Sequence, residues 1–195
     1  MQVLFATTLH PGARSSGGER VSAAFVDALR AAGHRVTVLG YRRSGASLSP
    51  RSPEDLDVGP RAIETRRAGV WPVWWMVRAL VRGVPYSAAK YDGRAYRRAF
   101  AQALARLDGG LVVIDHAQLS WLLELLPAGP RVVLLAHNVE HRLYAEQARG
   151  PGLAARINGR EARRVLDRER ALCARADTVW TLTAADRDRL AALGA

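Results

Sequence analysis

The sequence has one cysteine, one lysine and no long apolar run. Because Cys173 is alone, no disulfide can form within the chain. No apolar run reaches the roughly 18 residues that a membrane-spanning helix needs. The N-terminus, from Met1 to Ala6, has no basic segment and no signal-like cleavage site, so we expect it to begin the fold as a strand. These absences favour a cytoplasmic protein.

Acidic residues are also in deficit, and the formal net charge is +11. Such an excess indicates an anionic partner, either nucleic acid, anionic lipid or a phosphorylated substrate. Lys90 is the only lysine among the 29 basic residues, and the arginines are spread along the chain among acids. This distribution is typical of solvated faces. RNA-recognition and zinc-finger signatures are absent, so we expect no nucleic-acid partner.

The chain of 195 residues is long enough for one domain, 1–195, with one hydrophobic core. Apolar runs alternate with segments of helical periodicity, which predicts an α/β fold: a Rossmann-like parallel sheet with helices on both faces. We expect Gly33 just past the first helix, Pro72 in a helical first turn, Thr183 capping a last helix, and a surface loop over 44–60. The expected strands are 2–7, 35–39, 61–67, 111–115, 131–136 and 178–182, and the expected helices are 19–32, 71–83, 93–107, 119–126, 139–148 and 152–175.

Polar residues follow several of these strands. In an open α/β sheet, ligands bind beyond the carboxyl ends of the strands, so we expect these residues to converge. The glycine pair Gly17–Gly18 stands where the first helix begins, where backbone N–H groups can approach an anion closely. The polar residues that follow strands include Thr8, His10, Asp115, His116, His137, Asn138, Glu140, Thr181 and Thr183.

Two other kinds of site have weak support in the sequence. The glycine pair is neither the Gly-x-Gly-x-x-Gly of dinucleotide enzymes nor a Walker loop, which argues against a dehydrogenase. The string from His137 through Glu140 to His141 matches H-x-x-E-H of a zinc peptidase group. In such a site both histidines share one helix face, whereas His137 is expected at a strand end. We therefore expect no metal and no cofactor.

Four segments in this order resemble the N-terminal domain of GT-B glycosyltransferases, specifically the retaining family 4 enzymes. They are FATTLHPGARSSGGERV, AAGHRVTVLG, VVLLAHNVEHRLY and RERALCARADTVWTLTAADRDRL. The segment RGVPYSAAKYD (82–92) is similar to a subgroup linked to exopolysaccharide assembly. The resemblance covers nearly the whole chain and implies the N-terminal half of a GT-B fold.

The resemblance implies a function for each matching residue. The enzyme transfers a sugar from a nucleotide-sugar donor to an acceptor hydroxyl on a glycan, a lipid-linked molecule or a small molecule, without a metal. Gly17 and Gly18 match the loop near the donor phosphates, and His137 matches the cleft histidine that approaches the donor sugar. We expect Asn138 and Glu140 in the same cleft. His10 and His116 are expected there from their positions alone.

The resemblance also implies that a second, donor-binding domain is missing from this chain. The chain ends at Ala195, where the linker of the family would begin, so we expect it to be inactive by itself. Glu161 and Glu169 have the spacing of the acidic pair of that second domain. In a helix, however, their side chains are roughly 80° apart, so we interpret the spacing as a coincidence. A non-catalytic module that binds sugar or lipid is the alternative.

The segment from Trp71 to Arg82 has two interpretations. It could be an amphipathic element at the inner face of the membrane, with Trp71, Trp74 and Trp75 at the interface and Arg78 and Arg82 facing anionic headgroups. It could equally be a helix packed into the fold or against a lipid-linked acceptor.

Overall fold

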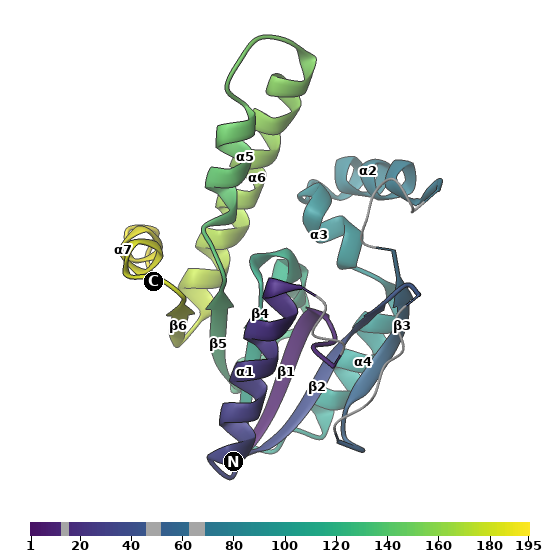
Figure 1. Ribbon diagram of the computed structural model, residues 1–195, viewed down its shortest axis with the longest axis vertical. Coiled ribbons are helices and arrows are strands. Elements are labelled where there is room, and N and C mark those ends of the chain that lie inside the picture. The colour runs from purple at the N-terminus through teal and green to yellow at the C-terminus, as the bar shows by residue number, and fades with distance from the viewer. Residues whose placement is uncertain (13–15, 46–51, 63–68) are drawn as a thin grey trace.

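The computed structural model describes residues 1–12, 16–45, 52–62 and 69–195. Within them, six parallel strands form one sheet in the order β3-β2-β1-β4-β5-β6 (Figure 1). The α/β prediction of a Rossmann-like parallel sheet is confirmed. The strands are β1 (Gln2–Leu9), β2 (Arg35–Arg43), β3 (Leu56–Arg61), β4 (Leu111–Asp115), β5 (Arg131–Ala136) and β6 (Thr178–Thr181).

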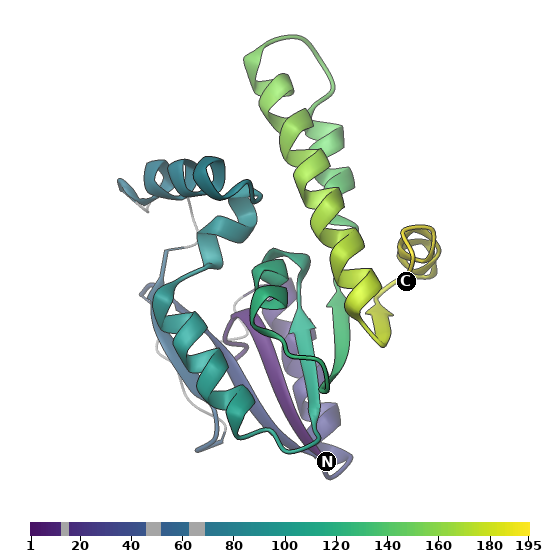
Figure 2. The ribbon, with the colours of Figure 1, turned by 180° about the vertical axis from the view of Figure 1, so that it is seen from behind.

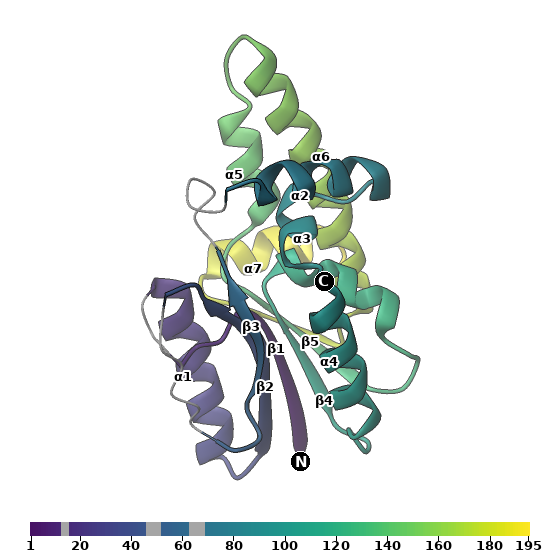
Figure 3. The same cartoon turned by 90° about the vertical axis from the view of Figure 1, so that its right-hand side faces the viewer.

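Helices cover both faces of the sheet, with α1 on one side and α4 on the other (Figure 3). Helices α5 and α6 pack together as a hairpin that projects beyond the carboxyl ends of the strands, and α2 and α3 rise at the same end (Figures 1 and 2). None of the described helices is long and apolar enough to cross a bilayer. The helices are α1 (Gly17–Ala31), α2 (Trp71–Arg82), α3 (Tyr86–Tyr91), α4 (Arg94–Ala105), the 3-10 helix η2 (Ala117–Leu125), α5 (Glu140–Gln147), α6 (Leu153–Arg175) and α7 (Ala184–Ala191).

The core has two layers because successive strand residues point to opposite faces of the sheet. In β1, Val3 and Phe5 face α1, whereas Leu4 and Ala6 face α4 and η2. Burial of each large apolar side chain contributes about 1.5–3 kcal/mol. The α1 layer includes Val26, Val38, Val113 and Leu135, and the α4 layer includes Leu39, Tyr96, Phe100, Ile114, Trp121 and Leu134.

The third strand lies earlier in the chain than its prediction at 61–67. It spans Leu56–Arg61, inside the segment expected to be a surface loop, and residues 63–67 fall outside the described part of the chain. Leu56 and Val58 pack against the core, which explains the strand. Pro60 has no N–H to donate and is tolerated because β3 is at the edge of the sheet.

Other elements differ from the predictions in smaller ways. Helix α3 was not predicted, because its six residues are too few to show a helical period. The segment expected as a helix at 119–126 is a 3-10 helix. Helix α1 begins at Gly17, two residues early, because the Ser16 side chain accepts a hydrogen bond from the Glu19 N–H. The predictions for Gly33 (φ 80°), Pro72 and the Thr183 cap are confirmed.

The α4 layer of the core gives a stability prediction. Phe100 is fully buried, so Phe100→Ala is expected to lower the free energy of unfolding by about 3–5 kcal/mol through lost burial and a cavity. Leu153→Ala, at a position that is 73% exposed, is the matched control and should change it by less than about 0.5 kcal/mol. Urea denaturation measures both. A Phe100→Ala protein as stable as the control would contradict the described packing.

Candidate active site

The site begins with Asp115, the last residue of β4, whose side chain is completely buried. The Nε2 atom of His137, one residue beyond β5, lies 2.7 Å from Asp115 Oδ1. The Ser22 hydroxyl of α1 donates to Asp115 Oδ2 at 2.6 Å. Burial alone would raise the pKa of Asp115, but His116, His137 and Ser22 together hold it below its usual value. Asp115 is therefore a carboxylate at neutral pH.

The Asp115 carboxylate selects the tautomer of His137. A carboxylate only accepts hydrogen bonds, so Nε2 of His137 carries a proton and donates it. In the neutral imidazole, Nδ1 is then the acceptor. A Cβ placed on Gly18, in the first turn of α1, would lie 4.0 Å from this Nδ1. The accepting nitrogen therefore lies close to the N-terminus of α1, where a helix favours an anion.

His116 completes the cluster through an unusual backbone conformation. Among the described residues it is the only one other than glycine with a positive φ, 83°. Its N–H donates to the Leu135 carbonyl at 3.0 Å, and its ring stacks on His137 with centroids 3.9 Å apart. Burial lowers the pKa of His116, although Asp115 opposes this. Backbone strain of this kind is concentrated at functional sites.

The two glycines at the start of α1 have different surroundings. Gly18 faces the histidines, and a Cβ there would lie 3.8 Å from His116 Nε2. Gly17 has nothing within 4 Å of such a Cβ, so it lies in open space at the start of α1. Only Gly18 is thus brought into contact range of the two histidines.

Three further residues expected in the cleft have different environments. His10 is buried beside Asp55, with His10 Nε2 3.8 Å from the Asp55 carboxylate, and Gly12 N–H donates to its Nδ1. Burial is the main cause that lowers the pKa of His10. Asn138 is exposed next to His137. Glu140 is buried at the start of α5. None of the described contacts therefore joins His10 to the stacked pair of His116 and His137.

Glu169 of α6 holds the start of α5 in place. The Glu140 N–H donates to Glu169 Oε1 at 2.7 Å, and His141 Nδ1 lies 2.6 Å from Glu169 Oε2. Glu161 accepts a hydrogen bond from the Tyr86 N–H at 2.7 Å. Both glutamates lie in α6 and have structural partners, which agrees with the interpretation of their spacing as a coincidence.

The zinc-peptidase interpretation does not fit this geometry. Helix α5 begins at Glu140, so His137 precedes the helix, and the two histidines contact different carboxylates, Asp115 and Glu169. Ligand atoms of Asp115, His116 and His137 do lie within 4.8 Å of one another. The Nε2 atom of His137, however, is already engaged by the Asp115 carboxylate at 2.7 Å.

The tryptophans of α2 separate into exposed and buried residues. Trp71 and Trp74 are 54% and 57% exposed, but Trp75 is 2% exposed and packs on Tyr86. The expectation that Trp75 contacts a membrane is therefore wrong, because Trp75 is about 100° around the helix from Trp74 and faces the core. Arg78 and Arg82 both contact the Asp92 carboxylate.

Sequence reasoning did not assign a role to Asp115 or Ser22. The sequence did contain a signal for Asp115, which ends the apolar run LVVID. Burial of a carboxylate at the end of a strand costs free energy unless a partner satisfies its charge, so a partner could have been expected. Ser22 gave no signal, since a serine within an amphipathic helix is common on either face. The partnership of both residues with His137 follows only from the three-dimensional arrangement.

Three comparisons relate the chain to known proteins. A family model described as a glycosyl transferase 4-like domain matches residues 16–195. Among curated proteins nothing matches. Among solved structures, the chain is similar to sucrose-phosphate synthase from Thermosynechococcus elongatus, with a TM-score of 0.56 and 16% identity. The match covers 92% of this chain and 41% of that chain, and at this identity it shows a shared fold.

The buried Glu140 gives a prediction on pH. Burial, and next the neighbouring Glu169, raise its pKa from 4.5 to about 8. The folded protein then keeps a proton that the unfolded chain releases above pH 4.5, so the free energy of unfolding should fall as the pH rises from 4.5 to 8. The loss is ~1.4 kcal/mol for each unit of pKa difference. Urea denaturation at several pH values measures it.

Glu140→Gln removes the titrating group, so this variant should lose less stability across that range and exceed the wild type above pH 8. Glu146→Gln, at an exposed position of the same helix, is the control and should behave as the wild type. The assignment fails if the two variants have the same pH profile.

Proposed function

Because the chain belongs to the glycosyl transferase 4-like family, we propose that it is the acceptor-side domain of a two-domain enzyme that moves a sugar from a nucleotide-sugar donor to an acceptor hydroxyl. The observation that carries the proposal is the contact of His137 with Asp115 beside the N-terminus of α1. This places a tautomer-fixed histidine and a helix N-terminus together at the carboxyl edge of the sheet. A hydroxyl-bearing ligand with a phosphate fits both groups.

The reaction exchanges one bond to the anomeric carbon for another. The bond from this carbon to the phosphate oxygen breaks, a bond to the acceptor oxygen forms, and the acceptor proton passes to the leaving diphosphate. The anomeric configuration is retained. Negative charge grows on the leaving group during this step, so preorganised donors near it accelerate the reaction. The backbone N–H groups of Gly17 and Gly18 are our candidates for such donors.

His137 binds the transferred sugar in this proposal. Its Nδ1 accepts a hydrogen bond from a sugar hydroxyl, while Asp115 holds the opposite ring nitrogen in the donor state. His116 supports the ring by stacking and keeps it from rotating. Asn138, exposed beside His137, is positioned to contact the sugar or the acceptor. Precise orientation of such groups accounts for a large part of enzymatic rate enhancement.

The second domain supplies most donor contacts in this proposal, so the isolated chain lacks activity. The acceptor is a glycan or a lipid-linked molecule in polysaccharide assembly, since segment 82–92 is similar to exopolysaccharide enzymes. We also propose that the enzyme works at the inner face of the membrane, with the exposed Trp71 and Trp74 at the interface.

A non-catalytic module that binds sugar or lipid is the second candidate. The exposed apolar residues of α2 favour it, because they suit binding and have no part in the transfer chemistry. Binding of a nucleotide sugar without transfer or hydrolysis, in the protein with its native downstream sequence, would favour this candidate over the enzyme.

The role of His137 is tested in the two-domain protein. His137→Ala is expected to lower kcat/KM by at least about 100-fold, since it removes the group that orients the sugar. Asp115→Asn should lower it by a similar factor, because an amide no longer selects the same tautomer. A transfer assay with a labelled nucleotide sugar measures both.

His34→Ala is the matched control. His34 lies between α1 and β2, just before the amino end of β2, whereas the candidate site lies at the carboxyl ends of the strands. It should retain wild-type turnover. Circular dichroism checks that each variant is folded. Unchanged turnover in a folded His137→Ala protein would disprove the assigned role.

A further inference from the structure

Helix α6 carries two buried acids, Glu161 and Glu169, which are 8% and 1% exposed. Glu161 accepts a hydrogen bond at 2.7 Å from the N–H of Tyr86, the first residue of α3. Glu169 accepts one at 2.7 Å from the N–H of Glu140, the first residue of α5. Because their side chains are roughly 80° apart around α6, the two acids reach different helices. Each acid satisfies an N–H that has no partner within its own helix.

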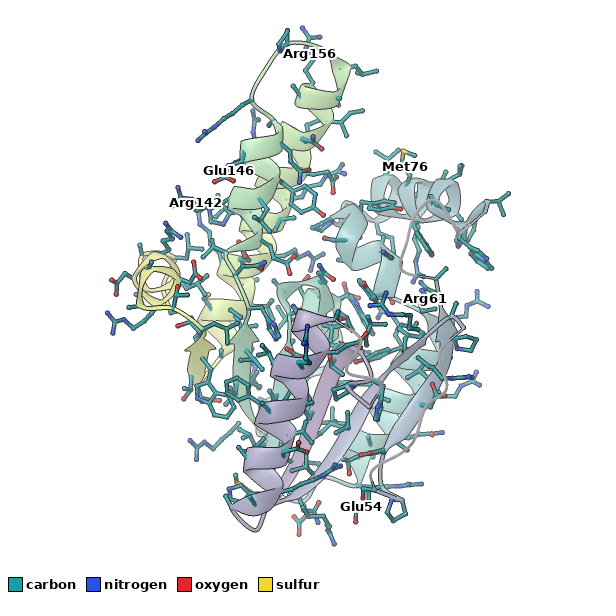
Figure 4. All side chains as sticks on the ribbon, viewed as in Figure 1. Glu54, Arg61, Met76, Arg142, Glu146 and Arg156 are labelled. Carbon is teal, nitrogen blue, oxygen red and sulfur yellow. The ribbon has the colours of Figure 1, made fainter. Side chains whose placement is uncertain are left out.

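The start of α5 depends on Glu169 because the chain provides no side-chain cap of its own there. Val139 occupies the capping position, and its apolar side chain cannot accept a hydrogen bond. Glu169 Oε2 accepts the His141 N–H at 3.3 Å and lies 2.6 Å from His141 Nδ1. Arg142 and Glu146 of the same helix are exposed and point outward from it (Figure 4). One carboxylate of α6 therefore holds the first turn of α5, where a helix favours negative charge.

This contact lies next to His137 along the chain. Only Asn138 and Val139 separate His137 from Glu140. Val139 is 3% exposed and packs in the α4 layer of the core, whereas Asn138 is exposed. At one end of this segment His137 contacts Asp115, and at the other end the Glu140 N–H contacts α6. A displacement at the start of α5 would therefore pass through a short, packed segment to the His137 ring.

The second stacked histidine is linked to the same place. The Gln118 side chain hydrogen-bonds the Glu140 carboxyl group. Gln118 lies in the 3-10 helix η2, which follows His116 directly. The segments that follow the two stacked histidines therefore meet at Glu140, whose N–H is accepted by Glu169.

We propose that Glu169 is a positioning residue of the candidate site, which sets the orientation of the His137 ring by holding the start of α5. Glu169 contacts neither sugar nor phosphate and acts through the intervening chain. This role rests on the proposed function of His137 in sugar transfer. A purely structural role would make Glu169 equivalent to Glu161, whose contacts are with Tyr86 at the start of α3 and with Arg164 of its own helix.

Nitrogen NMR of the histidine rings in the 195-residue chain tests the proposal. In the wild type, with the imidazole neutral, the His137 signals should show a protonated Nε2 and an unprotonated Nδ1. Glu169→Ala should move both signals toward the average of the two tautomers, because the ring is no longer held against Asp115. The chain has five histidines, and the His137 signals are those that His137→Ala removes.

Glu169→Asp is the milder variant, since it keeps the carboxylate and withdraws it by one methylene. It should move the His137 signals in the same direction by a smaller amount, and it tests the proposal if Glu169→Ala does not fold. Circular dichroism checks the fold of each variant.

Turnover of the protein with its native downstream sequence is the second measurement. Glu169→Ala should lower kcat by about 10-fold and leave KM within about 2-fold, since a misoriented His137 ring is felt mainly in the transition state. A loss of stability alone would lower the amount of folded enzyme without changing the His137 signals of the folded fraction.

Glu161→Ala is the matched control, because it removes a buried acid of the same helix that holds the start of α3. It should lower the stability to urea to a similar extent but leave the His137 signals as in the wild type. Unchanged His137 signals in the folded Glu169 variants, the same change in Glu161→Ala, or a wild-type kcat in Glu169→Ala would each overturn the proposal. Since the NMR samples contain no sugar donor, unchanged signals would leave the proposed transfer reaction untouched, and absence of transfer would leave the NMR result intact.

Discussion

The burial of one carboxylate determines the arrangement of the candidate site. Asp115 ends a strand that has no exposed residue, so its charge must be satisfied by neighbouring groups. His137 and Ser22 supply them from the next strand and from α1, and His116 turns back onto them through a left-handed backbone. Without these contacts the buried carboxylate would destabilise the sheet edge. Stability and the proposed chemistry therefore depend on the same hydrogen bonds.

The parallel sheet makes this arrangement possible. Since all six strands run in one direction, the residues after β4 and β5 meet at one edge, although 22 positions separate Asp115 from His137 along the chain. The same edge receives the N-terminus of α1 because the β-α-β unit brings each helix start to the carboxyl end of a strand. The helices α2, α3, α5 and α6 rise beyond that edge (Figure 1).

Sequence patterns predicted the buried parts of the fold well. The strands β1, β4 and β5 were predicted from continuous apolar runs. Such runs arise because residues on both faces of a covered parallel sheet are buried. The edge strand β3 escaped prediction, since its LDVGPR sequence contains a glycine and a proline that indicate a loop. His137, His116 and Gly18 were predicted together, but the position of His10 beside Asp55 depends on long-range packing. The burial of Trp75 also required the structure, since α2 carries apolar residues on most of its sides and the sequence does not show which side faces the core.

The central proposal is that this chain is one domain of a two-domain transferase. It is tested most directly by a nucleotide-sugar transfer and hydrolysis assay on the 195-residue chain and on the chain joined to its native downstream sequence. Activity is expected only in the longer protein. Comparable activity in the short chain would mean that the domain contains a complete catalytic site, and would contradict the account.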